Sequence, residues 1–216
     1  MIKMARRKRA SSQDTETFAE MPRRFKPKNE AQARLWDVIG QNVVTIILGP
    51  PGSAKTFVAT SWAFDAVSRG EFNRIVMTRP LIQSTEQTGW LKGSLEDKTA
   101  PFMRPMTDIV RKISPKEPEI DVIPLAFMRG ITLEHCVGLL DEAQNCNVAQ
   151  LKLYLTRLGD NAKLIISGDT DQVDVNDSGL LQVAERLRGL PGVGVFEFTK
   201  ADIVRHPLVG AMLDRF

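Results

Sequence analysis

Short apolar segments alternate with amphipathic ones along most of the chain. Six segments are apolar and rich in β-branched or aliphatic residues, which is typical of strands. They lie at 43–48, 74–78, 120–125, 136–140, 163–167 and 193–198. Several are apolar throughout, without the alternation of a half-exposed strand, and this indicates a parallel sheet that helices cover on both faces.

Between these segments, apolar residues recur with the spacing of amphipathic helices. The pattern predicts helices at 29–40, 55–68, 99–113, 148–157, 178–189 and 202–215. This alternation predicts a three-layer α/β fold, with a doubly wound and mainly parallel sheet between helices. Ligands of such folds bind at the carboxyl ends of the strands, so we expect functional residues there. The segment 80–98 is polar and lacks a convincing period, and we interpret it as a long, functional loop or small excursion.

Basic side chains gather at the start of the chain. Residues 1–28 carry nine basic and three acidic side chains, a net charge of +6, whereas the whole chain carries +3. We expect 1–24 to form a basic arm and 25–216 to form one domain, because 216 residues leave no room for a second full-sized domain. The arm could contact the phosphate backbone of a nucleic acid. A solvated terminus that only aids solubility is the alternative.

The composition is that of a soluble globular protein, with 43% hydrophobic and 25% charged residues. No apolar run approaches the roughly 18 residues of a membrane-spanning helix, so we expect no membrane association. A cytoplasmic location follows, in the host cytoplasm if a phage encodes the chain. Cys136 and Cys146 are expected as free thiols there. His135 and His206 have no Cys or His at the spacing of metal ligands, and the sequence does not predict zinc.

The first candidate site follows the segment 43–48. It is the run Gly49-Pro50-Pro51-Gly52-Ser53-Ala54-Lys55-Thr56, which Phe57 continues into an amphipathic segment. A strand, such a loop and a helix in this order predict a P-loop, whose backbone N–H groups wrap the phosphates of ATP. Lys55 would reach the β and γ phosphates, and the Thr56 hydroxyl would hold Mg²⁺. The alternative is an ordinary glycine-proline turn.

One residue departs from the usual P-loop, because Ala54 stands where glycine normally precedes the lysine. Alanine is tolerated there if the position has helical backbone angles, although its methyl group crowds the phosphates slightly. We therefore expect Ala54 to affect the rate of turnover more than the binding of nucleotide.

The segment 136–140 ends in two adjacent carboxylates, Asp141 and Glu142. Beside a P-loop, Asp141 would lie near Mg²⁺, and Glu142 could polarise the attacking water as a general base. Paired acids at a strand end could instead cap the next helix.

The segment 163–167 opens into a polar tip that contains Gln172. A glutamine at the end of a neighbouring strand can bond the γ phosphate or the attacking water. The aspartates of this tip lack the glycine and the terminal glutamate of an EF-hand calcium loop. A plain loop with capping aspartates is the alternative.

Together these residues resemble the PhoH-like family of ATPases, whose core is a RecA-like P-loop domain related to the first motor domain of superfamily-one helicases. The resemblance covers roughly 25–216. Beyond the P-loop it includes the runs at 75–80, 124–130, 141–145, 155–159, 168–172 and 204–209. The Asp-Glu-Ala-Gln and Gly-Asp-x-x-Gln runs also look like helicase motifs two and three.

The resemblance implies further site residues. Gln32 is placed like the glutamine that reads the adenine edge in related helicases, with a surface helix residue as the alternative. Arg79, Arg129, Arg157 and Arg205 match arginines of the family pattern. Cores of this type often form rings in which one subunit donates an arginine to its neighbour's nucleotide. Arg205 is the first candidate for that arginine and Arg157 the second.

Helicases of the two-domain kind place nucleotide between two RecA-like halves, and this chain has room for one. The resemblance therefore implies a magnesium-dependent ATPase that acts as a homo-oligomer, possibly a hexameric ring, and binds RNA or single-stranded DNA. Arg79, Arg129 and Trp90 would face the nucleic acid, with Trp90 either stacking on a base or buried against its own loop.

A rival hypothesis is a nucleotide-dependent switch that docks a protein partner and hydrolyses slowly. A small-molecule kinase is not favoured, because such an enzyme needs a lid of arginines and a substrate pocket. A nuclease is not predicted either, because the sequence has no separate group of carboxylates for it. Members of the family occur in phages and are associated with phosphate starvation, which does not define the role of this chain.

Overall fold

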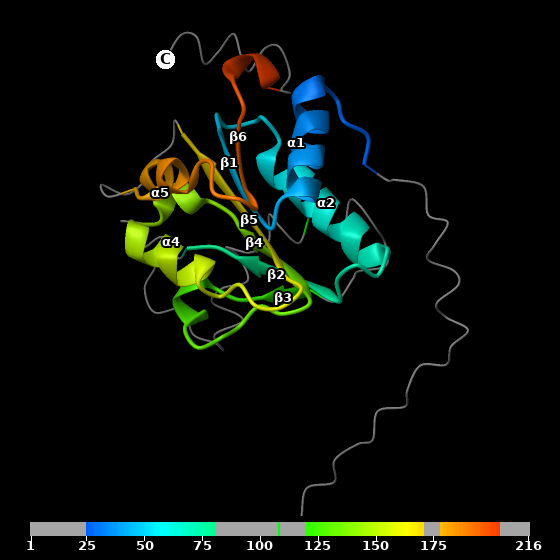
Figure 1. Cartoon of the computed structure of the whole chain (residues 1–216). Coiled ribbons are helices and arrows are strands. Elements are labelled where there is room, and N and C mark those ends of the chain that lie inside the picture. The colour runs from blue at the N-terminus through cyan, green and yellow to red at the C-terminus, as the bar shows by residue number, and fades with distance from the viewer. Residues whose placement is uncertain (1–24, 81–107, 109–119, 171–177, 204–216) are drawn as a thin grey trace, which may run out of the picture.

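Six parallel strands form a sheet between two layers of helices in the computed structural model (Figure 1). The structure describes residues 25–80, 108, 120–170 and 178–203. The strands are β1 Val44–Gly49, β2 Arg74–Thr78, β3 Ile120–Val122, β4 Cys136–Leu140, β5 Lys163–Asp169 and β6 Val193–Glu197. The helices are α1 Glu30–Gln41, α2 Lys55–Ser68, α4 Val148–Leu155 and α5 Leu180–Leu187, with 3-10 turns η1 Leu125–Phe127, η2 Ala143–Asn145 and η3 Lys200–Asp202.

The order of strands across the sheet is β3-β2-β4-β5-β1-β6. Because β5 lies between β1 and β4, the loop after β1 and the carboxylates after β4 flank the tip of β5. All three strands are parallel, so their carboxyl ends meet at one edge of the sheet. The three segments in which the sequence predicts functional residues therefore converge.

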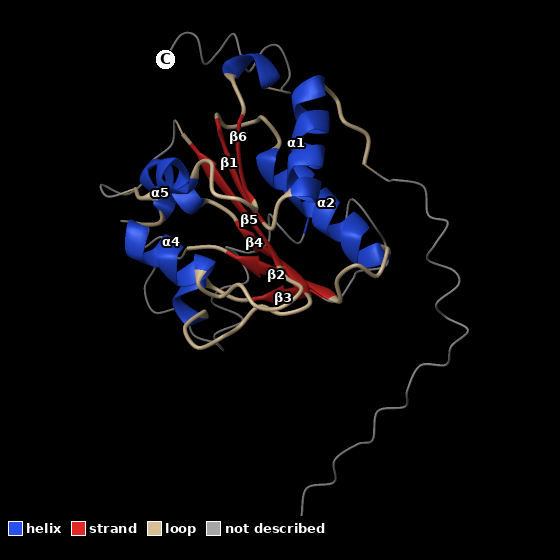
Figure 2. Cartoon of the chain, viewed as in Figure 1, coloured by secondary structure: helices blue, strands red, loops and turns tan. Residues whose placement is uncertain are grey.

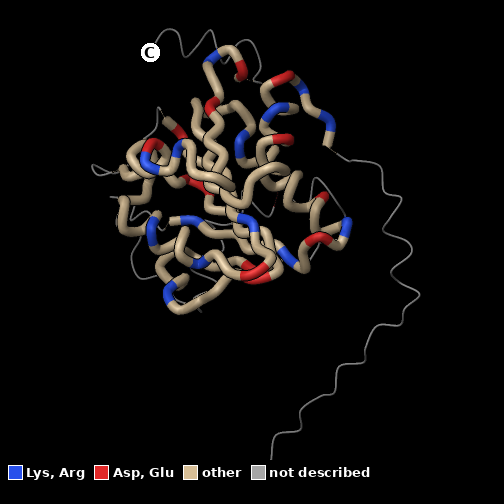
Figure 3. Tube along the Cα trace, in the orientation of Figure 1, with Lys and Arg blue, Asp and Glu red and all other residues tan. Residues whose placement is uncertain are grey.

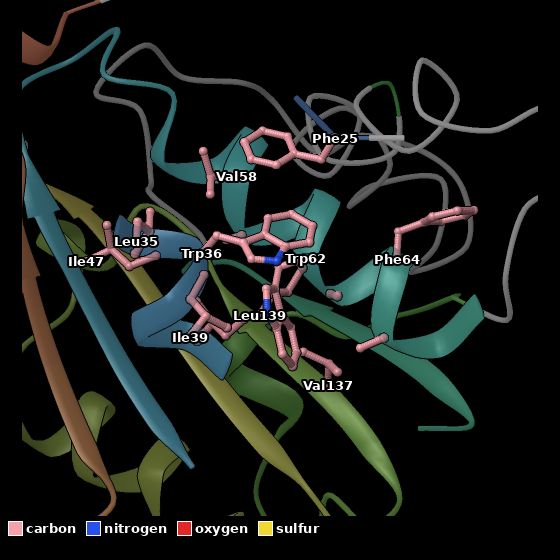
Figure 4. Close-up of a cluster of buried hydrophobic side chains, with 14 of the residues drawn as sticks. Phe25, Leu35, Trp36, Ile39, Ile47, Val58, Trp62, Phe64, Val137 and Leu139 are labelled. Atoms are coloured by element: carbon pink, nitrogen blue, oxygen red, sulfur yellow. The ribbon is translucent and has the colours of Figure 1, made fainter. Parts of the chain in front are cut away.

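Helices cover both faces of the sheet, α1 and α2 on one side and α4 and α5 on the other (Figure 2). All six residues of β1 and all five of β4 are buried, which explains why β4 is apolar throughout and β1 is apolar apart from Thr45. On the first side, Trp36 and Ile39 of α1 and Trp62 of α2 pack with Leu139 of β4 (Figure 4). Each such side chain contributes about 1.5–3 kcal/mol of burial free energy, so this cluster anchors both helices.

Phe25, the first described residue, belongs to the same cluster. Its ring stacks on Trp36 with centroids 4.7 Å apart and lies 6.0 Å from the ring of Phe57. The segment that leads into α1 is therefore attached to the first turn of α2. The arm at 1–24 lies outside the described residues.

The predicted α/β fold with a doubly wound parallel sheet is confirmed. All six predicted strands are found, and every strand end except the last residue of the third strand lies within two residues of its predicted position. The third strand is shorter than the predicted 120–125, because the chain turns at Pro124 into η1 and a proline has no N–H for the ladder. At the start of the helix predicted at 202–215 the structure has the 3-10 turn Lys200–Asp202, and the residues from 204 onward lie outside the described ranges.

Most of the predicted helix at 99–113 and the segment 81–98 also lie outside the described residues. Cys136 and Cys146 are buried and free, as expected. Among the described residues, no helix has both the length and the apolar character needed to cross a membrane.

Charged residues lie mainly on the helices and loops, and the strands at the centre of the sheet are largely uncharged (Figure 3). Lys163, at the start of β5, is a buried exception with 8% exposure. Its Nζ donates hydrogen bonds to the backbone carbonyls of Ile39 and Asn42 and lies 4.9 Å from the ring centroid of Trp62. The carbonyls of a last helical turn lack partners within the helix, so Lys163 ties the end of α1 to the sheet.

We predict that Lys163→Met destabilises the domain by about 1–3 kcal/mol, because two buried carbonyls lose their donor. Burial lowers the pKa of Lys163 to about 8 from 10.5. Between these values the unfolded chain binds a proton that the folded chain has released, so wild-type stability rises with pH relative to the variant. Urea unfolding at pH about 8 and about 9.5 measures this. The exposed Lys152→Met is the control, and a pH-independent difference would contradict the prediction.

Candidate functional site

The carboxyl ends of β1, β4 and β5 surround a cavity of about 400 Å³. Residues of the P-loop, the carboxylate pair and the tip of β5 line it: Pro51, Gly52, Ala54, Lys55, Thr56, Phe57, Asp141, Glu142, Gln144, Gly168 and Asp169. Segments far apart in the sequence thus meet at one place. The site predicted from separate motifs is a single cavity in the structure.

The loop after β1 follows the inner edge of this cavity. Gly49 has φ +147°, and a Cβ there would lie 2.6 Å from the Cβ of Phe198, so only glycine fits against the end of β6. The buried Ser53 hydroxyl donates to the carbonyl of Pro50 at 2.9 Å and closes the loop. Lys55 Nζ donates to the carbonyls of Gly49 and Pro50 at 2.7 and 2.9 Å. The lysine is therefore held across the loop it belongs to.

The helix α2 begins at Lys55 and opens onto the cavity. No side chain caps its N-terminus, whereas Asn29 caps α1 and Asn147 caps α4. Uncapped N–H groups and the positive end of the helix dipole attract an anion. Together with the Lys55 ammonium they form a site suited to phosphate.

Ala54 does not have the helical angles under which the sequence analysis found it tolerable. Its φ and ψ are +67° and +27°, in the left-handed region. A methyl group clashes with the backbone there, at a cost of roughly 1–2 kcal/mol. The usual glycine at this position is explained by backbone conformation, and Ala54 strains the loop.

Asp141 follows β4 and is 6% exposed. Its Oδ1 accepts hydrogen bonds from the Thr56 hydroxyl at 2.8 Å and the Ser167 hydroxyl at 2.9 Å. Burial raises the pKa of Asp141, while the Arg79 guanidinium and these two hydrogen bonds oppose the rise. A carboxylate and a hydroxyl in contact, facing a cavity, are oxygen ligands that suit Mg²⁺.

Glu142 also lines the cavity, and its side chain is 38% exposed. Its Oε1 accepts from Arg79 at 2.6 Å, and its Oε2 accepts from the amide of Gln144 at 2.6 Å. Glu142 has φ +56°, a left-handed conformation that turns the chain from β4 into η2. Strained backbone of this kind is frequent at functional sites. Glu142 stands at the N-cap position of η2, but its side chain makes no cap bond there, and Asn147 caps α4. The alternative that the two acids merely cap the next helix is therefore wrong.

Arg79 lies at the end of β2, beside this carboxylate pair. Its side chain is 15% exposed, and its Nε lies 3.5 Å from Asp141 Oδ2 in addition to the contact with Glu142. The sequence predicts a contact of Arg79 with nucleic acid and gives no sign of this position beside the two carboxylates. Its contact with nucleic acid stays a prediction.

Gln32 lines a second, smaller cavity of about 160 Å³ together with Lys28, Ala54 and Phe57. It is 1% exposed, and its Oε1 accepts from the backbone N–H of Lys28 at 2.9 Å. The alternative of a surface helix residue is therefore wrong. Because Ala54 and Phe57 line both cavities, the smaller one adjoins the phosphate site.

Two of the remaining predicted site residues, Arg129 and Arg157, lie among the described residues and do not line the cavity. Gln172, Arg205 and Trp90 lie outside the described residues. Arg129 is exposed, and Arg157 is half-buried, with Nε and one terminal nitrogen bonded to the carbonyls of Leu153 and Ile131. The proposed roles of these residues stay predictions.

Sequence reasoning missed Ser167 and the part played by Gln144. Ser167 is a buried hydroxyl at the end of an otherwise aliphatic strand, and that signal could have marked it. Gln144 stood within the Asp-Glu-Ala-Gln run, but nothing in the sequence showed which way its amide would face.

Comparisons with known proteins identify the family of the chain. Residues 24–216 match the family described as PhoH-like protein. A PhoH-like protein of Bacillus subtilis is 37% identical over 187 residues, which cover 82% of this chain and 59% of the relative. Protein PhoH of Escherichia coli K12 is 37% identical over 194 residues, covering 84% and 55%. The chain thus spans less than two thirds of these relatives.

Among solved structures, the large terminase of a thermophilic bacteriophage is similar, with a TM-score of 0.58 and 13% identity over 88% of this chain and 50% of the terminase. This likeness concerns the fold. It agrees with the RecA-like P-loop architecture that the sheet shows.

We predict that Ala54→Gly stabilises the protein by up to about 1 kcal/mol, because relief of the left-handed strain exceeds the entropic cost of glycine. The midpoint of thermal unfolding should rise by about 2–4 °C. Ala33→Gly in the middle of α1 is the matched control and should lower stability by about 1 kcal/mol. A fall of similar size for both variants would show that position 54 is not left-handed.

Proposed function

The chain belongs to the PhoH-like family, and from this premise we propose that it is a magnesium-dependent ATPase with the cavity at the carboxyl edge of the sheet as its active site. The observation that carries the proposal is the hydrogen bond of 2.8 Å between the Thr56 hydroxyl and Asp141. It joins the P-loop to the acidic strand end across 85 residues of sequence. These are the two oxygen groups that hold the metal in P-loop ATPases.

The donors present fit Mg²⁺. Within the described part of the chain, no group of three or more His, Cys, Asp or Glu could hold a metal ion. Mg²⁺ commonly takes one or two protein oxygens and completes its octahedron with phosphate and water, so Thr56 and Asp141 suffice. Bound together with ATP, the ion neutralises charge on the β and γ phosphates.

The side chains of the cavity have separate roles in the proposed reaction. Lys55 exchanges its two loop carbonyls for phosphate oxygens, while the N-terminus of α2 faces the same charge. Glu142 accepts a proton from a water molecule as that water's oxygen bonds to the γ phosphorus. The bond from the γ phosphorus to the bridging oxygen breaks, and ADP leaves with that electron pair.

The smaller cavity is proposed as the site of the nucleobase. It adjoins the P-loop at Ala54 and Phe57, and Gln32 supplies an amide within it. An amide can pair with the donor and acceptor of the adenine edge. The bacteriophage terminase has been solved with ATP-gamma-S, so a RecA-like fold of this kind accommodates such a nucleotide.

We propose further that the ATPase acts as a homo-oligomer on RNA or single-stranded DNA. The support is the cluster of basic residues at 1–24 and the resemblance to helicase motifs. Arg205 or Arg157 would reach a neighbouring subunit's nucleotide, and Gln172 would sense its γ phosphate. The switch with slow hydrolysis is the competing proposal.

We predict that Glu142→Gln lowers the kcat of ATP hydrolysis by about 10²- to 10⁴-fold, because the amide cannot accept the proton of water. The Kd for ATP should change little, since Glu142 does not belong to the P-loop. Phosphate release and nucleotide binding measure the two quantities. Glu134→Gln, an exposed residue outside the cavity, is the control. Equal turnover in wild type and Glu142→Gln would refute the assignment of the base.

The same assay separates the two proposals for its partners. A nucleic-acid motor predicts that RNA or single-stranded DNA raises turnover and that salt weakens binding. Light scattering with ATP should give a mass above that of the monomer. A monomer at every concentration would exclude the donated arginine, and turnover that no nucleic acid changes would favour the switch.

A further inference from the structure

The proposed base, Glu142, is held by a side chain that has no assigned role. Gln144 lies in η2, is 1% exposed and lines the cavity. Its Nε2 donates to Glu142 Oε2 at 2.6 Å, and its Oε1 accepts from the backbone N–H of Asp169 at 2.9 Å. We infer that Gln144 is the positioning residue of Glu142, which fixes the carboxylate for attack by water. The inference rests on the proposed function.

The direction of the Gln144 amide follows from its partners. The backbone N–H of Asp169 can only donate, so the amide oxygen must face it. The amide nitrogen then necessarily faces Glu142, where an ionised carboxylate can only accept. Both ends of the amide are matched to a group that cannot reverse its role. The Gln144 amide therefore holds the carboxylate of Glu142 in one orientation.

Close packing around η2 favours the contact between Gln144 and Glu142. A Cβ at Gly168 would lie 2.9 Å from the backbone nitrogen of Gln144 and 2.2 Å from Leu180 Cδ2. Only glycine at the tip of β5 allows η2 to pack so closely on the strand. The left-handed turn at Glu142 brings the side chains of residues 142 and 144 within contact on the same edge.

Arg79 completes the arrangement from the other side. It binds Oε1 of Glu142 at 2.6 Å, so that β2 and η2 hold one oxygen each. An ionised carboxylate has about four acceptor positions. Two are used, the plane of the carboxylate is fixed, and acceptor positions stay available for a water molecule. Such preorganisation of a general base lowers the barrier of the step in which it takes a proton.

The amide could alternatively be a buried polar group that only stabilises η2. In that case removal of the Gln144 amide would lower the stability of the protein. It would also lower kcat by the same factor whether or not Glu142 is present. A positioning residue acts through the base, so its effect on kcat must vanish when the base has been removed.

The test is a double-mutant cycle with Gln144→Met and Glu142→Gln. Gln144→Met should lower kcat by about 10- to 100-fold in the wild-type background, because a hydrogen bond to a charged group is lost. In the Glu142→Gln background it should lower the residual turnover by less than about twofold. The Kd of a fluorescent ATP analogue should stay within about twofold of wild type throughout.

A second variant keeps the shape of the side chain. Gln144→Glu retains an oxygen for the N–H of Asp169 and replaces the donor to Glu142 by an acceptor, so kcat should fall as far as in Gln144→Met. Gln182→Glu on the exposed surface of α5 makes the same chemical change as a control and should keep wild-type kcat.

A wild-type kcat in Gln144→Met would overturn the inference, and so would an equal loss of kcat in the wild-type and Glu142→Gln backgrounds. The proposed function would still stand in either case if Glu142→Gln itself had lost activity. Absence of ATP turnover in the wild type would overturn both.

Discussion

The site depends on the hydrogen bonds and the ion pair of one buried carboxylate, that of Asp141. A charge at 6% exposure is costly unless its oxygens are hydrogen-bonded. Here the partners come from three elements: Thr56 from α2, Ser167 from β5 and Arg79 from the end of β2. Satisfying one carboxylate thus fixes the P-loop helix against two strands. The placement of β5 between β1 and β4 makes this possible, because it sets a hydroxyl between loop and carboxylate.

Conformational strain is concentrated at the same edge. Ala54 and Glu142 both adopt left-handed backbone angles, and both line the cavity. The first turns the loop into α2, and the second turns the end of β4 into η2. Strain of this kind persists only where surrounding contacts determine the conformation, and it belongs to sites that hold groups in fixed geometry. Compact packing at Gly49 and Gly168 provides such contacts.

The sequence determined the fold more fully than the site. Periodicity identified the strands because β1 and β4 are buried on both faces, and the P-loop was recognisable because its residues are consecutive. The contact of Arg79 with Asp141 and Glu142 was not predictable, since sequence shows neither the strand order nor that β2 lies beside β4. The conformation of Ala54 was also beyond reach, because a left-handed angle at a non-glycine residue is set by the closure of the loop. Ser167 and Gln144 each contact a residue about 25 positions away in the sequence, and local patterns do not record such contacts.

Lys55 and Glu142 differ in whether the proposed binding of nucleotide changes their hydrogen-bond partners. Lys55 is bonded to two neutral carbonyls of its own loop, and exchanging them for phosphate oxygens replaces neutral acceptors by charged ones, which form stronger bonds. Its movement therefore favours binding. Glu142 is already bonded to two charged or polar side chains, Arg79 at Oε1 and Gln144 at Oε2, and in the proposed mechanism it keeps both partners. In the proposed ATPase, affinity would therefore arise from a group that changes its partners, and turnover would depend on a group that keeps them. Preorganisation of the second kind is where enzymes gain most of their electrostatic advantage.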